Sequence, residues 1–287
     1  MIRIAIPNKG RLSEGARELL ERAGLEFDIT SERALQAALG GEFLGLFVRA
    51  RDIPEFVADG AADIGITGRD LLTESGRPLE VLLDLGFGRC RVVVAAREDS
   101  DITRVDDVPA GSRVATAFPR VTQDFFERAC RPVTIVPVSG AAEIAPHLGV
   151  ADIICDLVST GSTLKVNGLR EVATVLDSTA LLVTRAELLE DAAIRRKVNE
   201  LTAALASVLR AQDKRYLMAN VPRSVLPEIK RILPGITGPT IVDVMDGGHH
   251  VAAHAVVDAR EVYRIIAELK SVGAEGILVT RIERLMP

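Results

Sequence analysis

The chain has 287 residues, about the length of two domains, of which 48% are hydrophobic and 26% are charged. This composition is typical of a soluble enzyme, and it excludes a disordered chain, a collagen-like repeat and a disulfide-dense secreted scaffold. The formal net charge of −5 and the aromatic content of 3% argue against nucleic acid or an anionic membrane as a partner. An anionic ligand would therefore need a local site.

The N-terminal segment and the cysteines indicate the compartment. The segment MIRIAIPNKGRL carries charge within its first apolar run and lacks the apolar core of a signal peptide. No stretch approaches about 18 uninterrupted apolar residues, so we expect no membrane span. The three cysteines are too few and too scattered for a disulfide framework. We therefore expect a cytoplasmic protein.

Short strands alternate with helices through the first 180 residues. Gly24 is expected to end the first helix, Pro54 lies in the first turn of the second, and residues 67–70 turn into a third. Such alternation predicts a largely parallel sheet with ligands at the carboxyl ends of its strands. Strands are expected at residues 2–6, 43–48, 62–66, 92–96, 114–117, 133–138 and 152–155, and further helices begin near Pro119 and Ala141.

A long amphipathic helix is predicted over residues 185–210, and such a helix often returns a chain to its first lobe. We therefore expect an α/β protein with two α/β lobes. Lobe I comprises residues 1–90 and 181–212, and lobe II comprises residues 91–180. This arrangement resembles the type II periplasmic-binding-protein fold.

The last 75 residues follow a different order of elements. They predict a ferredoxin-like βαββαβ domain at residues 213–287, similar to the small ACT-like effector-binding modules of biosynthetic enzymes. A capping box at residues 258–261 is expected to open the second helix, and a turn is expected at residues 246–248. The strands are expected at residues 215–221, 240–244, 250–257 and 276–282, and the helices at residues 224–233 and 258–271.

The loop Ser159-Thr160-Gly161-Ser162-Thr163 follows an apolar strand and leads into a helix. Its hydroxyls, its backbone N–H groups and the helix N-terminus together suit a phosphate, and glycine allows close approach. Asp156, just upstream, can accept hydrogen bonds from ribose hydroxyls. The alternative is an ordinary polar capping loop after a strand-end turn residue, but the pairing of the acid with the loop favours a phosphate site.

This stretch is similar to the 5-phosphoribosyl-1-pyrophosphate (PRPP) signature of the ATP phosphoribosyltransferase family. The shared elements are Glu143, Gly149, the pair Ala151-Asp152, the run Asp156-Leu157-Val158 and the loop 160–163. The resemblance implies PRPP contacts from eight residues: Glu143, Asp152, Asp156, Ser159, Thr160, Gly161, Ser162 and Thr163.

Two N-terminal stretches, residues 7–12 and residues 49–54 with 63–70, resemble the ATP-site loops of the same family. They place four cations at strand ends, which could neutralise a triphosphate or a pyrophosphate. Asp70 is either a helix N-cap or a ligand near the adenine. The resemblance therefore assigns ATP binding to Lys9, Arg11, Arg49, Arg51 and Asp70.

The resemblance covers the whole chain and implies the long form of the enzyme. It implies Mg²⁺-dependent transfer of phosphoribose from PRPP to N1 of ATP, the first step of histidine biosynthesis, with feedback inhibition by histidine. It also implies a homo-oligomer, a hexamer built from dimers. Asn220 stands where an acid that could pair with an amino group would be expected. The residues that match the effector region are Asn220, Ile236, Gly238, Thr240 and Ala274.

Two other functions fit parts of the sequence. A solute-binding protein also has two α/β lobes, and any phosphoribosyltransferase could use the phosphate loop. His250 and His254 share a strand face, but no further ligand lies nearby in the sequence, so ordinary polar roles are favoured over zinc binding. A structural role is likewise favoured for His147, and an inert thiol for Cys155.

Overall fold

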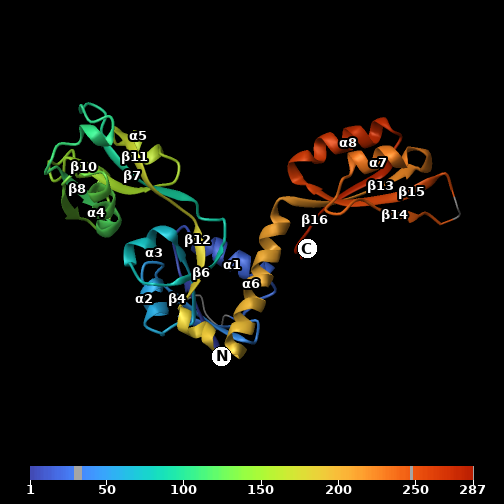
Figure 1. The fold of residues 1–287 in the computed structure, drawn as a ribbon, viewed down its shortest axis with the longest axis horizontal. Coiled ribbons are helices and arrows are strands. Elements are labelled where there is room, and N and C mark those ends of the chain that lie inside the picture. The colour runs from blue at the N-terminus through green and yellow to red at the C-terminus, as the bar shows by residue number, and fades with distance from the viewer. Residues whose placement is uncertain (29–33, 246–247, 287) are drawn as a thin grey trace. The chain divides into compact units, whose positions relative to one another are not determined.

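The computed structural model describes residues 1–28, 34–245 and 248–286. The chain forms two compact units, residues 1–202 and residues 203–287 (Figure 1). The unit boundary lies within the long helix α6 (Ala192–Gln212). Each unit has its own sheet or sheets and its own buried core.

The first sheet of residues 1–202 has seven strands in the order β2-β3-β4-β1-β5-β12-β6. Its central strands are buried because helices cover the sheet, so they are almost continuously apolar. The strands are β1 (Ile2–Pro7), β2 (Phe27–Asp28), β3 (Gln36–Leu39), β4 (Phe43–Val48), β5 (Ile64–Gly68), β6 (Glu80–Asp84) and β12 (Ala180–Thr184). The helices are α1 (Ser13–Arg22), α2 (Ile53–Ala58) and α3 (Arg69–Ser75).

The second sheet has five strands in the order β11-β7-β10-β8-β9. Alternate residues of β7 enter two cores, because successive side chains of a strand point to opposite faces: Val92 and Val94 lie in one core with Phe126, and Val93 lies in the other with Leu164. The elements are β7 (Cys90–Arg97), β8 (Arg113–Thr116), α4 (Pro119–Arg128), β9 (Thr134–Pro137), β10 (Ile153–Val158), α5 (Ser162–Val166) and β11 (Leu169–Ser178).

Both sheets are mixed, so the prediction of a largely parallel sheet is wrong. In the first sheet only β1 pairs in parallel, with β4 and with β5, and in the second only β8 does, with β9 and with β10. The pairs made by β7 and β12 are antiparallel because the chain passes between the sheets twice in extended segments, from β6 to β7 and from β11 to β12, without a crossover helix. The strands β2, β3 and β4 follow one another along the chain and are antiparallel neighbours. The α/β class and the two-lobed arrangement expected from the sequence are confirmed.

The two crossing segments are hydrogen-bonded to each other. Ser178 at the end of β11 pairs with Cys90 at the start of β7. The N–H of Ala180 then donates to the carbonyl of Phe87 at 3.0 Å. Helices α3 and α4 are also linked, since the Glu74 carboxylate of α3 accepts the first N–H groups of α4, from Arg120 at 3.1 Å and from Val121 at 3.0 Å.

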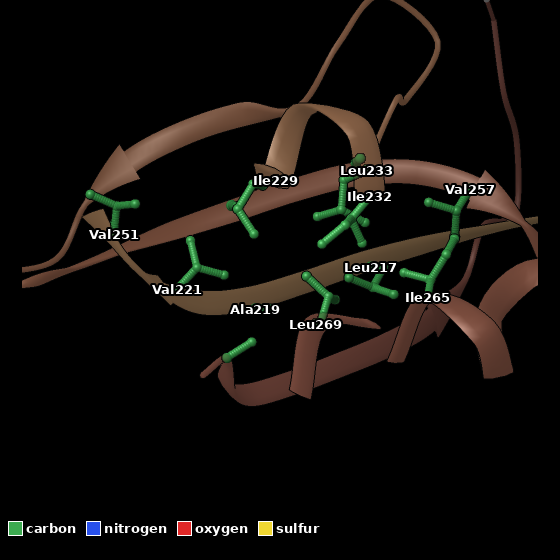
Figure 2. Packing of buried hydrophobic residues seen from close by; sticks show 13 residues of the cluster. Leu217, Ala219, Val221, Ile229, Ile232, Leu233, Val251, Val257, Ile265 and Leu269 are labelled. Atoms are coloured by element: carbon green, nitrogen blue, oxygen red, sulfur yellow. The ribbon is translucent and has the colours of Figure 1, made fainter. Parts of the chain in front are cut away.

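Residues 203–287 fold as the expected βαββαβ domain. The sheet order β14-β15-β13-β16, with antiparallel neighbours throughout, is that of a ferredoxin-like fold. Side chains of β13, β15, α7 and α8 pack on one face of the sheet, and Leu217, Ile229 and Leu269 are completely buried there (Figure 2). The elements are β13 (Lys214–Pro222), α7 (Leu226–Ile232), β14 (Thr240–Asp243), β15 (His250–Asp258), α8 (Val262–Ser271) and β16 (Glu275–Arg281).

Three predicted helices differ from the structure at their N-terminal ends or in type. The long helix begins at Ala192 and not at residue 185, because the Asp191 carboxylate accepts the N–H groups of Ala193 and Ile194 at 2.8 and 3.1 Å and caps it there. The helix predicted near Ala141 is a single 3-10 turn, since Ala141 itself has a left-handed backbone with φ 50°. The capping box is absent, because the Asp258 carboxylate binds the Lys214 ammonium at 2.6 Å. The turn expected at residues 246–248 lies partly outside the described residues.

Candidate functional site

The strand before the phosphate-loop candidate ends three residues later than the sequence suggests. β10 continues to Val158, so Asp156 lies inside the strand, opposite Val93, and not at its end. Burial raises the pKa of Asp156, the nearby Glu143 carboxylate raises it further, and a hydrogen bond from the Leu157 N–H at 2.7 Å opposes the rise. Asp156 is therefore a half-buried acid that binds a proton more readily than a surface aspartate.

A pocket of about 130 Å³, here called the loop pocket, opens where β10 ends. Its polar lining comes from Glu143, Asp156 and the hydroxyl-rich loop, and Leu164 and the end of β10 line the rest of it. Ser159 and Thr160 are exposed to solvent, and Thr160 and Ser162 share a hydrogen bond at 2.9 Å. The lining residues are Glu143, Asp156, Leu157, Val158, Ser159, Thr160, Gly161, Thr163 and Leu164.

Gly161 permits the turn from the loop into α5. Its φ of 78° is left-handed, a conformation that costs other L-residues energy. An added Cβ would meet no protein atom within 4 Å. The backbone angle, and not a steric clash with the rest of the protein, is therefore what favours glycine here. α5 has only five residues, so its dipole is small, and the hydroxyl and N–H groups of the loop supply most of the polarity.

Asp152 does not join the loop pocket. It precedes β10 at the opposite end from the loop, about 20 Å away at the usual rise of a strand. There its carboxylate accepts the Arg113 backbone N–H at 2.7 Å and the Arg113 guanidinium at 3.2 Å. In this structure Asp152 therefore links the start of β10 to the start of β8.

Three of the expected ATP-binding cations are exposed at neighbouring strand ends. Lys9 follows β1 and Arg49 follows β4, and these strand ends are joined by a hydrogen bond from the Asn8 N–H to the Val48 carbonyl at 2.8 Å. Arg51 lies beyond β4, and its guanidinium donates to the carbonyl of Ala117 at 3.1 Å.

Arg11 and Asp70 instead bind each other. The Arg11 guanidinium reaches the two Asp70 carboxylate oxygens at 2.7 and 2.8 Å and also donates to the Gly88 carbonyl. Asp70 is only 1% exposed, and its carboxylate also accepts the Ser178 hydroxyl at 2.5 Å. Gly68 is the N-cap of α3, so the interpretation of Asp70 as the N-cap is wrong. The buried Asp70 carboxylate can therefore act on a ligand only through its partners, Arg11 and Ser178.

A larger pocket of about 470 Å³, here called the arginine pocket, was missed by the sequence reasoning. It lies where the crossing segments meet the end of β10, and Ser159 lines both pockets. The signal in the sequence is the pair of arginines in Gly88-Arg89-Cys90-Arg91, which only the strand pairing brings next to the loop. The lining residues are Arg69, Asp84, Arg89, Cys90, Arg91, Ser159, Asp177, Ser178 and Thr179.

The five expected effector residues fall into two groups in residues 203–287. Asn220 on β13 lies beside β16, where its side-chain amide is next to Gly276, and Ala274 directly precedes that strand. The other three belong to the start of β14 and the loop before it, and β15 separates β14 from β13. They are Ile236, Gly238 and Thr240.

The remaining candidates have ordinary partners. The His254 imidazole is hydrogen-bonded to the Tyr216 hydroxyl, and the His147 imidazole to the Asn167 carbonyl at 2.7 Å. Burial raises the pKa of the Cys155 thiol to about 12, which leaves it a poor nucleophile. Within residues 1–28, 34–245 and 248–286, no group of three or more His, Cys, Asp or Glu side chains is placed to hold a metal ion by itself. Over the same ranges, no helix is long and apolar enough to span a membrane.

Known proteins resemble the whole chain. Residues 49–207 match the family described as ATP phosphoribosyltransferase, and residues 211–284 match the family described as HisG, C-terminal domain. The ATP phosphoribosyltransferase of Gemmatimonas aurantiaca is 60% identical, and that of Methanocaldococcus jannaschii is 43% identical, each over 100% of both chains. The solved ATP phosphoribosyl transferase (HisG:HisZ) complex from Thermotoga maritima contains a chain with 30% identity and a TM-score of 0.65, covering 73% of this chain and 99% of that one. The resemblance seen in the sequence is thereby confirmed, and the chain belongs to the ATP phosphoribosyltransferase family.

Proposed function

We propose that this protein transfers the phosphoribosyl group of PRPP to N1 of ATP, giving phosphoribosyl-ATP and pyrophosphate in the first step of histidine biosynthesis. The bond from the anomeric carbon to the pyrophosphate oxygen breaks and its electron pair leaves with pyrophosphate, while the N1 lone pair forms the new bond. The observation that carries the proposal is the loop pocket, where an acid pair and a hydroxyl loop line one cavity in a chain of this family.

In this proposal the loop pocket holds the phosphoribosyl end of PRPP. The hydroxyls and N–H groups of residues 159–163 bind the 5′-phosphate, and Asp156 and Glu143 accept hydrogen bonds from the ribose hydroxyls. Fixing the sugar at both ends aligns its anomeric carbon with the incoming nitrogen, which accounts for much of the acceleration in a reaction of this kind. The attacking nitrogen carries no proton, so the step needs no strong general base.

For ATP, we assign Lys9, Arg49 and Arg51 to the nucleotide phosphates. Their exposure at adjacent strand ends supports this, because exposed guanidinium and ammonium groups can bind phosphate without first breaking an internal ion pair. Arg11 is not assigned to the phosphates in the same way, because its guanidinium is already bound to Asp70. Only the N–H groups of Arg11 that do not contact Asp70 can bind a ligand.

Mg²⁺ is the cofactor in this proposal. Magnesium is commonly held by one or two carboxylates together with phosphate oxygens and water, so a complete cage of protein ligands is not needed. Asp177 fits this pattern, because it lines the arginine pocket, is exposed, and has no ion pair with any residue of the described ranges. When bound, the ion supplies positive charge that stabilises the departing pyrophosphate.

The domains also take proposed roles. Residues 1–90 with 181–212 form catalytic lobe I, residues 91–180 form lobe II with the PRPP loop, and residues 213–287 form a regulatory domain that binds histidine as feedback inhibitor. The match of residues 211–284 to HisG, C-terminal domain supports the last assignment. We further propose a cytoplasmic homo-oligomer, a hexamer built from dimers. Loss of histidine inhibition on removing residues 213–287, with turnover retained, would support the regulatory role, whereas persisting inhibition would refute it.

The activity is tested by following near-ultraviolet absorbance after mixing protein, Mg²⁺, ATP and PRPP with a pyrophosphatase that removes product. The wild-type protein should form phosphoribosyl-ATP. Asp156→Asn should lose most turnover, whereas Asp152→Asn, at the far end of the same strand, should keep its KM for PRPP. Folded wild-type protein that forms no product would refute the proposed activity, and equal effects of the two variants would refute the assigned role of Asp156.

A further inference from the structure

The arginine pocket contains one arginine that has no carboxylate partner. Arg69 binds Asp84 at 3.3 Å, and Arg91 binds Glu171 at 2.5 Å. Arg89 forms no ion pair with any residue of the described ranges, and only its Nε donates, to the Gly86 carbonyl at 3.1 Å. Its two terminal nitrogens therefore remain available for an anion that enters the pocket.

The backbone that carries Arg89 is held at several points. The Gly86 N–H donates to the Asp84 carboxylate at 3.0 Å, the Phe87 carbonyl accepts the Ala180 N–H, and the Gly88 carbonyl accepts Arg11. The Nε hydrogen bond then fixes the guanidinium of Arg89 itself. Such an arginine loses less conformational freedom on binding an anion than a mobile surface arginine does, so binding is favoured.

Ser159 relates this arginine to the loop pocket. It is the one residue common to the two lining sets, so the two cavities adjoin at Ser159. The loop pocket, at about 130 Å³, suits the compact end of a ligand that carries one phosphate, whereas the arginine pocket, at about 470 Å³, has room for a larger anion. A ligand matched to both has an anionic group at each end.

PRPP has that form, with a phosphate at C5 and a pyrophosphate at C1 of the ribose. We infer that Arg89 binds the pyrophosphate group of PRPP while residues 159–163 hold its 5′-phosphate, an inference that rests on the proposed function. The forked N–H donors of Arg89 meet the oxygens that gain negative charge as the bond to the anomeric carbon breaks. Arg89 then contributes both to substrate binding and to departure of the leaving group.

Binding of three probes to the full-length protein tests this inference by calorimetry in the presence of Mg²⁺: inorganic pyrophosphate, ribose 5-phosphate and ATP. Arg89→Gln should weaken pyrophosphate binding roughly tenfold to a hundredfold, the range for a lost hydrogen bond to a charged group. Its affinity for ribose 5-phosphate and for ATP should stay within about twofold of wild type. Arg89→Lys should be intermediate, since it keeps the charge without the fork.

The matched control is Arg97→Gln, which removes an arginine paired with Asp99 outside the pocket and should leave all three affinities unchanged. Unchanged pyrophosphate binding in Arg89→Gln would overturn the inference. An equal loss for ribose 5-phosphate, or a loss confined to ATP, would also overturn it. These outcomes are separate from failure of the proposed function, because wild-type protein that forms no phosphoribosyl-ATP leaves the binding comparison intact.

Discussion

The loop pocket and the Arg11–Asp70 pair are two polar regions of residues 1–202 that satisfy their charges differently. In the loop pocket, Glu143 and Asp156 face a cavity and repel each other, and the pKa of Asp156 is raised. In the pair, the buried carboxylate is matched by a guanidinium and a hydroxyl of the same chain. Groups without internal partners are free to bind substrate, whereas matched groups hold the architecture in place. The variants below test that division.

Asp70→Asn should have the largest effect on stability. It leaves Arg11 without its counter-charge in a partly buried site, and breaking one side of a buried pair costs about 3–5 kcal/mol. Thermal unfolding of residues 1–202 within the full-length protein should therefore shift to markedly lower temperature. Asp99→Asn, in an exposed pair, should change unfolding little. Similar shifts for the two variants would show that the Asp70 pair is not architectural.

Ser178→Ala should have the next largest effect. It removes one donor to the buried Asp70 carboxylate, and a hydrogen bond to a charged group contributes about 1.5–3 kcal/mol. Chemical denaturation should show this loss, with part of it recovered in Ser178→Thr, which keeps the hydroxyl. A Thr variant no better than Ala would indicate that the packing of Ser178, and not its hydroxyl, matters here.

Gly161→Ala should cost about 1–2 kcal/mol, since it forces an L-residue into a left-handed conformation. The new methyl group meets no protein atom, so the effect should come from the backbone and raise the KM for PRPP more than that for ATP. Gly140→Ala is the control, because that glycine also has open space around its Cβ but no positive φ. Equal kinetics for both variants would contradict a requirement for the turn at Gly161.

Asp156→Asn should have the smallest effect on stability, and with the opposite sign. Burial raises the pKa of Asp156 in the folded protein, with Glu143 adding to the rise, so ionisation at neutral pH disfavours the folded state. The variant should therefore be slightly more stable than wild type near pH 7. That gain should shrink as pH falls through the raised pKa and vanish below the ordinary pKa of an aspartate. A gain that is constant with pH, measured by thermal unfolding, would contradict this origin.

Local sequence patterns predicted most of the fold and the loop half of the site. The Asp156 to Thr163 stretch is continuous in sequence, so its strand, turn and hydroxyls could be recognised without tertiary information. The pairing of Arg11 with Asp70 could not be recognised in this way, because the two residues are 59 positions apart and the carboxylate has other possible partners. The arginine pocket was missed for the same reason, since it depends on how β7, β10 and β11 align. Two helix starts were predicted wrongly because each depends on the partner of one side chain. Asp191 accepts a backbone N–H group and caps α6, whereas Asp258 binds the Lys214 ammonium and caps no helix.

The hydrogen-bonded crossing segments determine how the two sheets of residues 1–202 can move. Because Cys90 pairs with Ser178 and the Phe87 carbonyl accepts the Ala180 N–H, the connection is a two-stranded ribbon and not a pair of independent tethers. Such a ribbon can bend perpendicular to its flat face, but sliding one strand along the other would break the hydrogen bonds between them. Relative motion of the sheets therefore requires this ribbon to bend as one unit, and residues of the ribbon such as Arg89 and Ser178 line the arginine pocket.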